Sequence, residues 1–168
     1  MENEMRMAAV ASATELSARA DREIVVTRIF EARREIVFAA HTRPEHLRAW
    51  MRGPEGWRMP VCELDFRPGG GWLLGWRGPD GALRVMSGEF QEIAPPERIV
   101  VAESRGGGWP ATLTSIGFAD DDGATELTTR ILYPSRAARD AAFTARMRRE
   151  TGAAHDRLAA LLPAIGWG

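Results

Sequence analysis

The stretch SRAARDAAFTARMRRETGAAHDRLAALL, residues 135–162, decides the fold. Proline stands on both sides of it, at Pro134 and Pro163, and a proline inside a helix removes a backbone hydrogen bond. Ser135 is a favourable N-cap residue. One set of side chains recurs at steps of three or four, which places the set on one helix face. These residues are Phe143, Met147, Thr151, Ala154, Leu158 and Leu161. The pattern predicts one helix of about 40 Å, which requires a wide partner surface.

The residues before this helix predict that surface as one antiparallel sheet. Glu23–Phe30 is rich in β-branched residues and predicts a strand, and short helices are expected over residues 31–42 and 45–51. Six more strands follow, separated by turn sequences rich in glycine, proline and aspartate. They are expected over residues 59–66, 72–77, 83–93, 98–104, 111–118 and 125–133. Apolar residues alternate along several of them, so one face of the sheet should be covered by the helix. The residues that share one face of their strand are Trp72, Leu74 and Trp76; Met86 and Phe90; Ile116 and Phe118; and Leu127, Thr129 and Ile131.

The composition is that of one globular domain with a sizeable core, 168 residues long and 45% hydrophobic. The net charge of −1 argues against nucleic-acid binding, and no apolar run is long enough for a membrane span. Cys62 is the only cysteine, which excludes an internal disulfide and is typical of a cytoplasmic protein. Residues 1–20 predict a flexible leader, weakly helical over residues 13–20. Residues 21–163 form the expected domain, and residues 164–168 form a tail.

Several stretches, in this order, resemble the SRPBCC superfamily and most closely its AHSA1-type branch, related to the activator of the Hsp90 ATPase. They are VVTRIFEARREIVFAAHTRPEHLRAWM, VCELDFRPGGGW, GPDG, GEFQEIAPPERIV, GATELTTR and residues 135–162. The resemblance covers about residues 21–162. It implies an α+β helix-grip fold, in which about seven antiparallel strands curl around the C-terminal helix and leave an apolar cavity. One departure is that Glu150 and His155 stand where relatives often have a glycine and an aromatic residue.

The chain carries six tryptophans, and side chains this large must be buried or line a site. Aromatic rings and flexible methionines suit an apolar ligand pocket, although the apolar pattern alone also fits a plain core. The candidate ligand-binding residues are Trp50, Trp72, Leu74, Trp76, Met86, Phe90, Ile116, Phe118, Phe143, Met147, Thr151 and His155.

The histidines offer little metal or acid–base chemistry. His41, Glu45 and His46 lack a metal-binding spacing and are expected to face solvent near a helix junction. His155 could act as a general base only with a partner group, and no carboxylate is evidently paired with it.

Other polar groups fit a solvated surface. Two pairs of carboxylates are expected on the wet face of the sheet, and the glycine runs at residues 69–71 and 106–108 are expected to be turns between strands. The carboxylates are Glu63, Asp65, Glu89 and Glu103. Arg146, Arg148 and Arg149 should lie on the solvent side of the long helix.

Together with these residues, the resemblance implies a bacterial, stress-related protein that binds a small hydrophobic or aromatic molecule between sheet and helix, with no cofactor or metal. Two alternatives stay open. One is a cyclase- or hydrolase-like enzyme that uses a polar cavity residue such as His155. The other is a co-chaperone that binds an Hsp90-type partner through its surface. An exposed sheet edge would also allow a homodimer.

Overall fold

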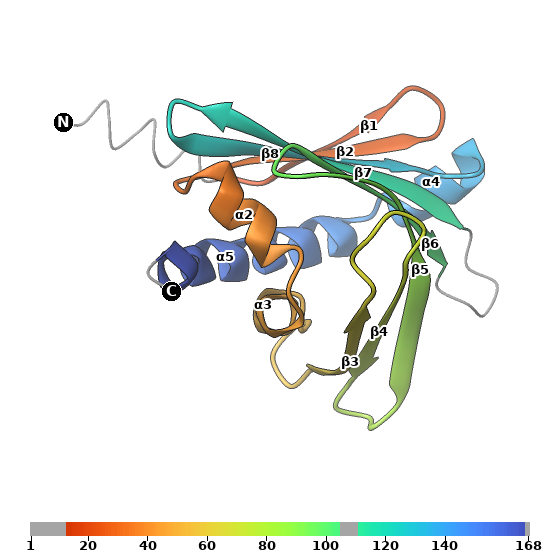
Figure 1. Ribbon diagram of the computed structural model, residues 1–168. Helices are drawn as coiled ribbons and strands as arrows, with labels where there is room; N and C mark the ends of the chain where they lie inside the picture. Colours follow the sequence, from red (N-terminus) through yellow and green to blue (C-terminus); the bar gives the residue numbers. More distant parts are fainter. Residues whose placement is uncertain (1–12, 105–110, 167–168) are drawn as a thin grey trace.

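A computed structural model describes residues 13–104 and 111–166. Its strands form one antiparallel sheet in the order β1-β2-β8-β7-β6-β5-β4-β3. The strands are β1 (Glu15–Arg19), β2 (Glu23–Phe30), β3 (Arg58–Leu64), β4 (Gly71–Arg77), β5 (Leu83–Ala94), β6 (Arg98–Ser104), β7 (Thr112–Asp121) and β8 (Ala124–Leu132). The helices are α2 (Arg34–Ala40), α3 (Pro44–Trp50), α4 (Arg136–Ala142) and α5 (Ala145–Gly166). The sheet bends between β7 and β6, and α5 lies inside the bend (Figure 1).

This arrangement confirms the predicted helix-grip fold and the predicted order of the elements, with eight strands among the described residues in place of about seven. The eighth strand is β1, which lies within the predicted leader. It pairs antiparallel with β2, and the pair Leu16↔Val26 buries Leu16 on the concave face. The prediction of a flexible leader with a weak helix is therefore wrong for residues 15–19, because pairing with β2 overrides a sequence with little strand propensity. Residues 1–12, the glycine run 106–108, Trp109 and Trp167 lie outside the described residues.

The predicted long helix is in fact two helices. Ser135 caps the first as expected, because its side chain accepts a hydrogen bond from Ala138 N at 3.0 Å. The chain leaves the helical conformation at Phe143, and Thr144 Oγ1 then accepts from Met147 N at 3.1 Å to start α5. The break allows the Phe143 ring to pack on a cluster that also contains Leu16 and Tyr133.

The predicted end of the helix at Pro163 is also wrong, since α5 continues through it to Gly166 and includes the start of the predicted tail. A proline near the end of a helix removes one hydrogen bond without ending the favourable packing of its neighbours. Leu162 and Ile165, on either side, both pack on the core.

The register sets the concave face. Leu74 pairs with Met86, Phe90 with Val101, and Ile116 with Ile99, so these side chains point to the same side of the sheet. The backbone of α5 runs alongside α2 and α3, whereas over the described residues it makes no comparably extended approach to any strand. The space between the backbone of α5 and the sheet is therefore wide enough for long side chains.

Candidate functional site

Eight of the predicted ligand-binding residues gather in one large cluster on the concave face, together with residues of α2, α3 and the C-terminal half of α5. These eight are Trp50, Trp72, Leu74, Trp76, Met86, Phe90, Ile116 and Phe118. Phe143 and Met147 are not among them, because they pack on a second, smaller cluster at the other end of α5 with Ile24 and Val26 of β2. Thr151 is half-buried, and it lies on α5 between Met147 of the smaller cluster and Ala154 of the larger one.

Four residues of β7 and β8 form a block where the two clusters meet. Thr114 pairs with Ile131, and Ile116 pairs with Thr129. Ile116 packs on the larger cluster and Ile131 on the smaller one. We call this block the interior boundary. Ile116, Thr129 and Ile131 are half-buried there, although they lie on the concave face of two central strands.

The next pair along the same strands is packed differently. Phe118 and Leu127 are 2% and 1% exposed. The concave face is thus fully covered at Phe118 and Leu127, whereas the neighbouring pair, Ile116 and Thr129, is partly exposed to solvent. Sequence reasoning placed Leu127, Thr129 and Ile131 on one face of their strand but missed the last two as site residues, because alternation does not report how well a face is covered.

Polar atoms without partners also lie on the concave face. Trp50 Nε1 donates to the Ala40 carbonyl at 2.9 Å, and Trp76 Nε1 donates to the Met51 carbonyl at 2.7 Å. Trp72 Nε1 and Thr114 Oγ1 are buried and have no partner among the described residues. Leaving such a group unpaired costs about 1–3 kcal/mol, so each one requires an explanation.

His155 is buried in a hydrogen-bonded chain. Its Nδ1 lies 3.0 Å from Thr14 Oγ1, and Arg28 donates to that hydroxyl at 3.3 Å. Arg28 is also paired with Asp156 at 2.7 Å, so the nearby carboxylate binds arginine and not histidine. Burial above all, and next His41 and Arg28, lower the pKa of His155 to about 4. At neutral pH the ring is uncharged and a weak base, which is poor chemistry for general base catalysis.

His41 does not face solvent as predicted. Its ring centroid lies 4.9 Å from that of Trp50 and 5.1 Å from that of Phe118. Nδ1 donates to the Val37 carbonyl at 2.8 Å, and burial lowers the pKa of His41 to about 4. The reason is helical spacing, since His41 keeps a helical conformation at the end of α2 and follows the buried residues Val37 and Phe38 by four and three positions. Among the described residues, no group of three or more His, Cys, Asp or Glu side chains is arranged to hold a metal ion.

The carboxylates are on the wet face with one exception. Glu63, Asp65 and Glu89 are exposed as predicted. Glu103 is half-buried, and its pairing with Gly88 and Thr112 puts it on the concave face, so the prediction for this residue is wrong. Thr112 Oγ1 donates to Glu103 Oε2 at 3.3 Å.

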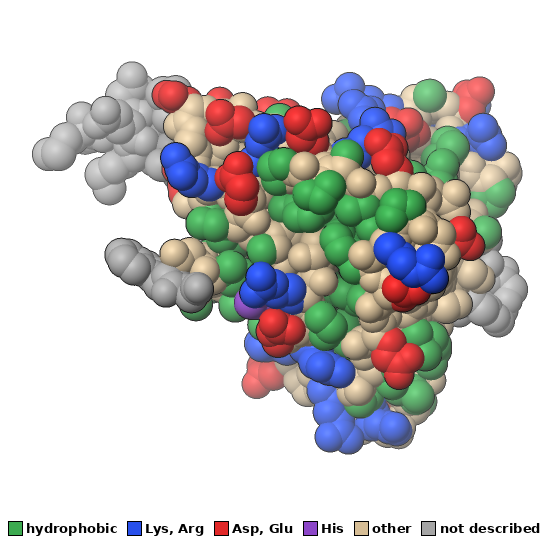
Figure 2. Space-filling view, viewed as in Figure 1, with side chains coloured by type: hydrophobic (Ala, Val, Ile, Leu, Met, Phe, Trp, Pro, Cys, Tyr) green, Lys and Arg blue, Asp and Glu red, His purple; other side chains and the backbone are tan. Residues whose placement is uncertain are grey.

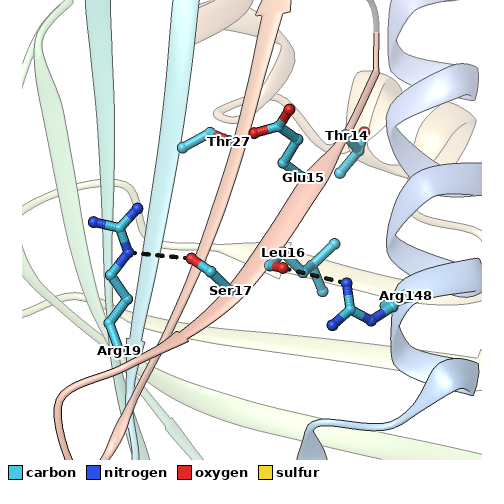
Figure 3. Close-up of a pocket in the computed structure, with 7 residues that line it drawn as sticks. All are labelled: Thr14, Glu15, Leu16, Ser17, Arg19, Thr27 and Arg148. Carbon is cyan, nitrogen blue, oxygen red and sulfur yellow. Dashed lines mark hydrogen bonds between the residues drawn. The ribbon is translucent and has the colours of Figure 1, made fainter.

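A groove of about 380 Å³ runs along the free edge of β1 (Figure 3). It is lined by Thr14, Glu15, Leu16, Ser17, Arg19, Thr27 and Arg148. Arg148 donates to the Leu16 carbonyl at 3.3 Å, and Arg19 donates to Ser17 Oγ at 3.2 Å. Arg148 is exposed as predicted, and its hydrogen bond in addition ties it to the sheet edge. The lining is mostly polar, which does not suit an apolar molecule.

None of the helices in the described part of the chain is both long enough and apolar enough to cross a membrane.

Comparison with known structures identifies several that share this fold. A protein of Rhodobacter sphaeroides is 29% identical with a TM-score of 0.86, over 91% of this chain and 99% of that one. A protein of Nitrosomonas europaea is 21% identical with a TM-score of 0.79, over 90% and 100% of the two chains. An AHSA1-like protein of Aeromonas hydrophila is 18% identical with a TM-score of 0.68, over 86% and 95%.

A search of curated proteins finds no match. The sequence profile of the family described as "Activator of Hsp90 ATPase homolog 1-like protein" matches residues 31–163. The match covers most of the chain and confirms the resemblance noted from the sequence, so the protein belongs to the AHSA1-like family of the SRPBCC superfamily.

Proposed function

We propose that this protein binds a small hydrophobic or aromatic molecule between the concave face of the sheet and α5. The observation that carries the proposal is the interior boundary, where Ile116, Thr129 and Ile131 stay half-buried between two separate apolar clusters. A solid core would bury these side chains as fully as it buries Phe118 and Leu127. A ligand placed there would complete the burial and gain about 0.8 kcal/mol for each CH₂ group removed from water.

Three further points support this proposal. The backbone of α5 approaches α2 and α3 more closely than it approaches the sheet, so the helix leaves room for a layer of large side chains and a ligand. On the face viewed in Figure 1, hydrophobic side chains gather at the centre with charged groups around them (Figure 2). The protein also belongs to a superfamily whose members bind hydrophobic molecules, and this analogy supports hydrophobic ligand binding by this protein.

The test is native mass spectrometry of protein exposed to a lipid and metabolite extract. The wild type is expected to carry a defined mass adduct that denaturation releases. Thr151→Trp would place an indole between the two clusters and is expected to abolish the adduct. Ala153→Trp adds the same ring at an exposed position of α5 and should leave the adduct in place.

A bare mass for the wild type, with no thermal shift across a panel of apolar compounds, would overturn ligand binding. The family description then favours the hypothesis that the protein is a co-chaperone. In that case an Hsp90-type protein should bind wild type and Thr151→Trp equally well, because the substitution changes the interior and not the surface.

A further inference from the structure

The three tryptophans of the larger cluster differ in the state of their indole N–H groups. Trp50 and Trp76 both donate to backbone carbonyls. Trp72 is 7% exposed, and its Nε1–H has no partner among the described residues. An indole nitrogen is only ever a donor, so the missing partner must be an acceptor.

The Trp72 ring is held in place against the sheet. Trp72 is paired with Gly88, and a Cβ built on Gly88 would lie 2.5 Å from Trp72 Cζ2 and 2.7 Å from Cε2. The ring thus occupies the space that a side chain at position 88 would need. An indole seated against backbone in this way has a fixed orientation, so the free N–H points in a defined direction.

A second unpaired group lies on the same face. Thr114 is 4% exposed, and its hydroxyl has no partner among the described residues. Thr114 on β7 pairs with Val101 of β6, which pairs with Phe90, two residues after Gly88 on β5. The hydroxyl and the strand beneath the Trp72 ring are therefore two strand spacings apart, roughly 10 Å. Thr114 also belongs to the interior boundary, where the proposed ligand lies.

We propose that the ligand carries a hydrogen-bond acceptor, such as a carbonyl or ether oxygen, that is held by Trp72 Nε1–H, and that the Thr114 hydroxyl contacts a second polar atom of the ligand. This inference rests on the proposed function and specifies the ligand class as an elongated apolar molecule with an acceptor at one end. The apolar clusters hold its body, and the two polar groups set its orientation.

The experiment compares two probes of nearly equal shape, 2-acetylnaphthalene and 2-ethylnaphthalene, by isothermal titration calorimetry. The wild type should bind the acetyl probe about tenfold more tightly, the usual value of one hydrogen bond made to a buried donor. Trp72→Phe keeps an aromatic ring and removes the N–H, so it should bring the acetyl affinity down to that of the ethyl probe. Trp50→Phe is the matched comparison: its indole N–H is already bonded to backbone, so loss of this ring should change the affinity for both probes alike and keep the tenfold preference.

Two further measurements keep the test independent of the behaviour of one variant. Thr114→Val is nearly isosteric and should leave the affinity for both probes unchanged, because the single polar atom of the acetyl probe is held by Trp72. It should weaken only 6-acetyl-2-naphthol, which adds a hydroxyl group at the far end of the same ring system and which the wild type should bind more tightly than 2-acetylnaphthalene. In the ¹⁵N-labelled wild type, the indole N–H resonance assigned to Trp72 should move downfield with the acetyl probe only. Equal binding of the two probes by wild type, or a preference that survives in Trp72→Phe, would overturn the inference and leave the proposed function intact. Failure of both probes to bind would overturn both.

Discussion

Replacing His155 with leucine should remove part of the acid sensitivity of the fold. The imidazole projects from α5 and is buried. Its pKa is lowered from 6.5 to about 4 by burial first and by His41 and Arg28 next. Between these two values the unfolded chain binds a proton that the folded protein does not. The free energy of unfolding must therefore fall as the pH drops from above 6.5 toward 4.

The size of the effect follows from the same values. One pH unit corresponds to about 1.36 kcal/mol, and pH 5 lies 1.5 units below 6.5, so one such histidine costs about 2 kcal/mol at pH 5 relative to pH 8. His41, with its pKa also lowered to about 4, adds a similar amount. Between pH 8 and pH 5 the two rings should lower the free energy of unfolding of the wild type by about 4 kcal/mol. The corresponding loss should be about 2 kcal/mol in His155→Leu and almost none in the double variant that also carries His41→Leu.

Urea unfolding followed by tryptophan fluorescence at pH 8 and pH 5 measures these losses. Carboxylates titrate in all the variants, so their contribution cancels when the pH-dependent losses are compared. An equal loss in wild type and His155→Leu would refute the reasoning, since it would mean that this ring protonates as readily in the folded protein as in the unfolded chain. A proton NMR titration of His155 with a midpoint near 6.5 would refute it independently.

Four further variants test the packing. Gly88→Ala should cost about 3 kcal/mol in urea unfolding, because the new methyl group would overlap a backbone carbonyl of β6 and the Trp72 ring; Gly152→Ala in α5 meets nothing within 4 Å and should instead stabilise the protein by about 0.5–1 kcal/mol. Arg139→Met should cost about 2 kcal/mol and speed amide exchange in β1, because this buried side chain donates to three backbone carbonyls at the β1–β2 turn; unchanged exchange there would contradict this role. Trp50→Phe should cost about 1–3 kcal/mol, because the carbonyl at the end of α2 loses its donor, and a thermal unfolding curve identical to wild type would speak against it.

Much of the fold was predictable because the local patterns agree with the tertiary structure. Glu23–Phe30 and Arg98–Ser104 form strands over the predicted residues, and the alternation of Trp72, Leu74 and Trp76 assigned them to the concave face. Each of these segments carries the strand propensity and the apolar period that its final position requires.

The errors arose where distant contacts override local preference. Residues 15–19 form a strand only because β2 lies beside them, and the helix breaks at Phe143 because its ring packs on residues of β1 and β8. The side chains of Thr14, Arg28 and His155 come together from widely separated parts of the chain, so no local pattern announces their contact.

For the candidate site, the sequence predicted only which residues lie on the concave face of the sheet. Alternation identified Trp72 and Ile116 as concave-face residues, but the division of that face into two clusters depends on how α4 and α5 cover it. The unpaired state of Trp72 Nε1 and Thr114 Oγ1 is likewise a property of the packed interior. Ligand binding at these residues remains a prediction.

The position of β2 in the sheet has a consequence for how the chain folds. β2 lies between β1 and β8, and Glu23 on it is bridged to Arg130, 107 residues later. During synthesis the first hairpin must therefore wait for the last strand before it can join the sheet. Pairings between such distant segments slow folding, because a long loop must close before any contact compensates for its entropy. Until then the apolar side of β2 is exposed, and this strand is where a nascent chain would be most prone to aggregation.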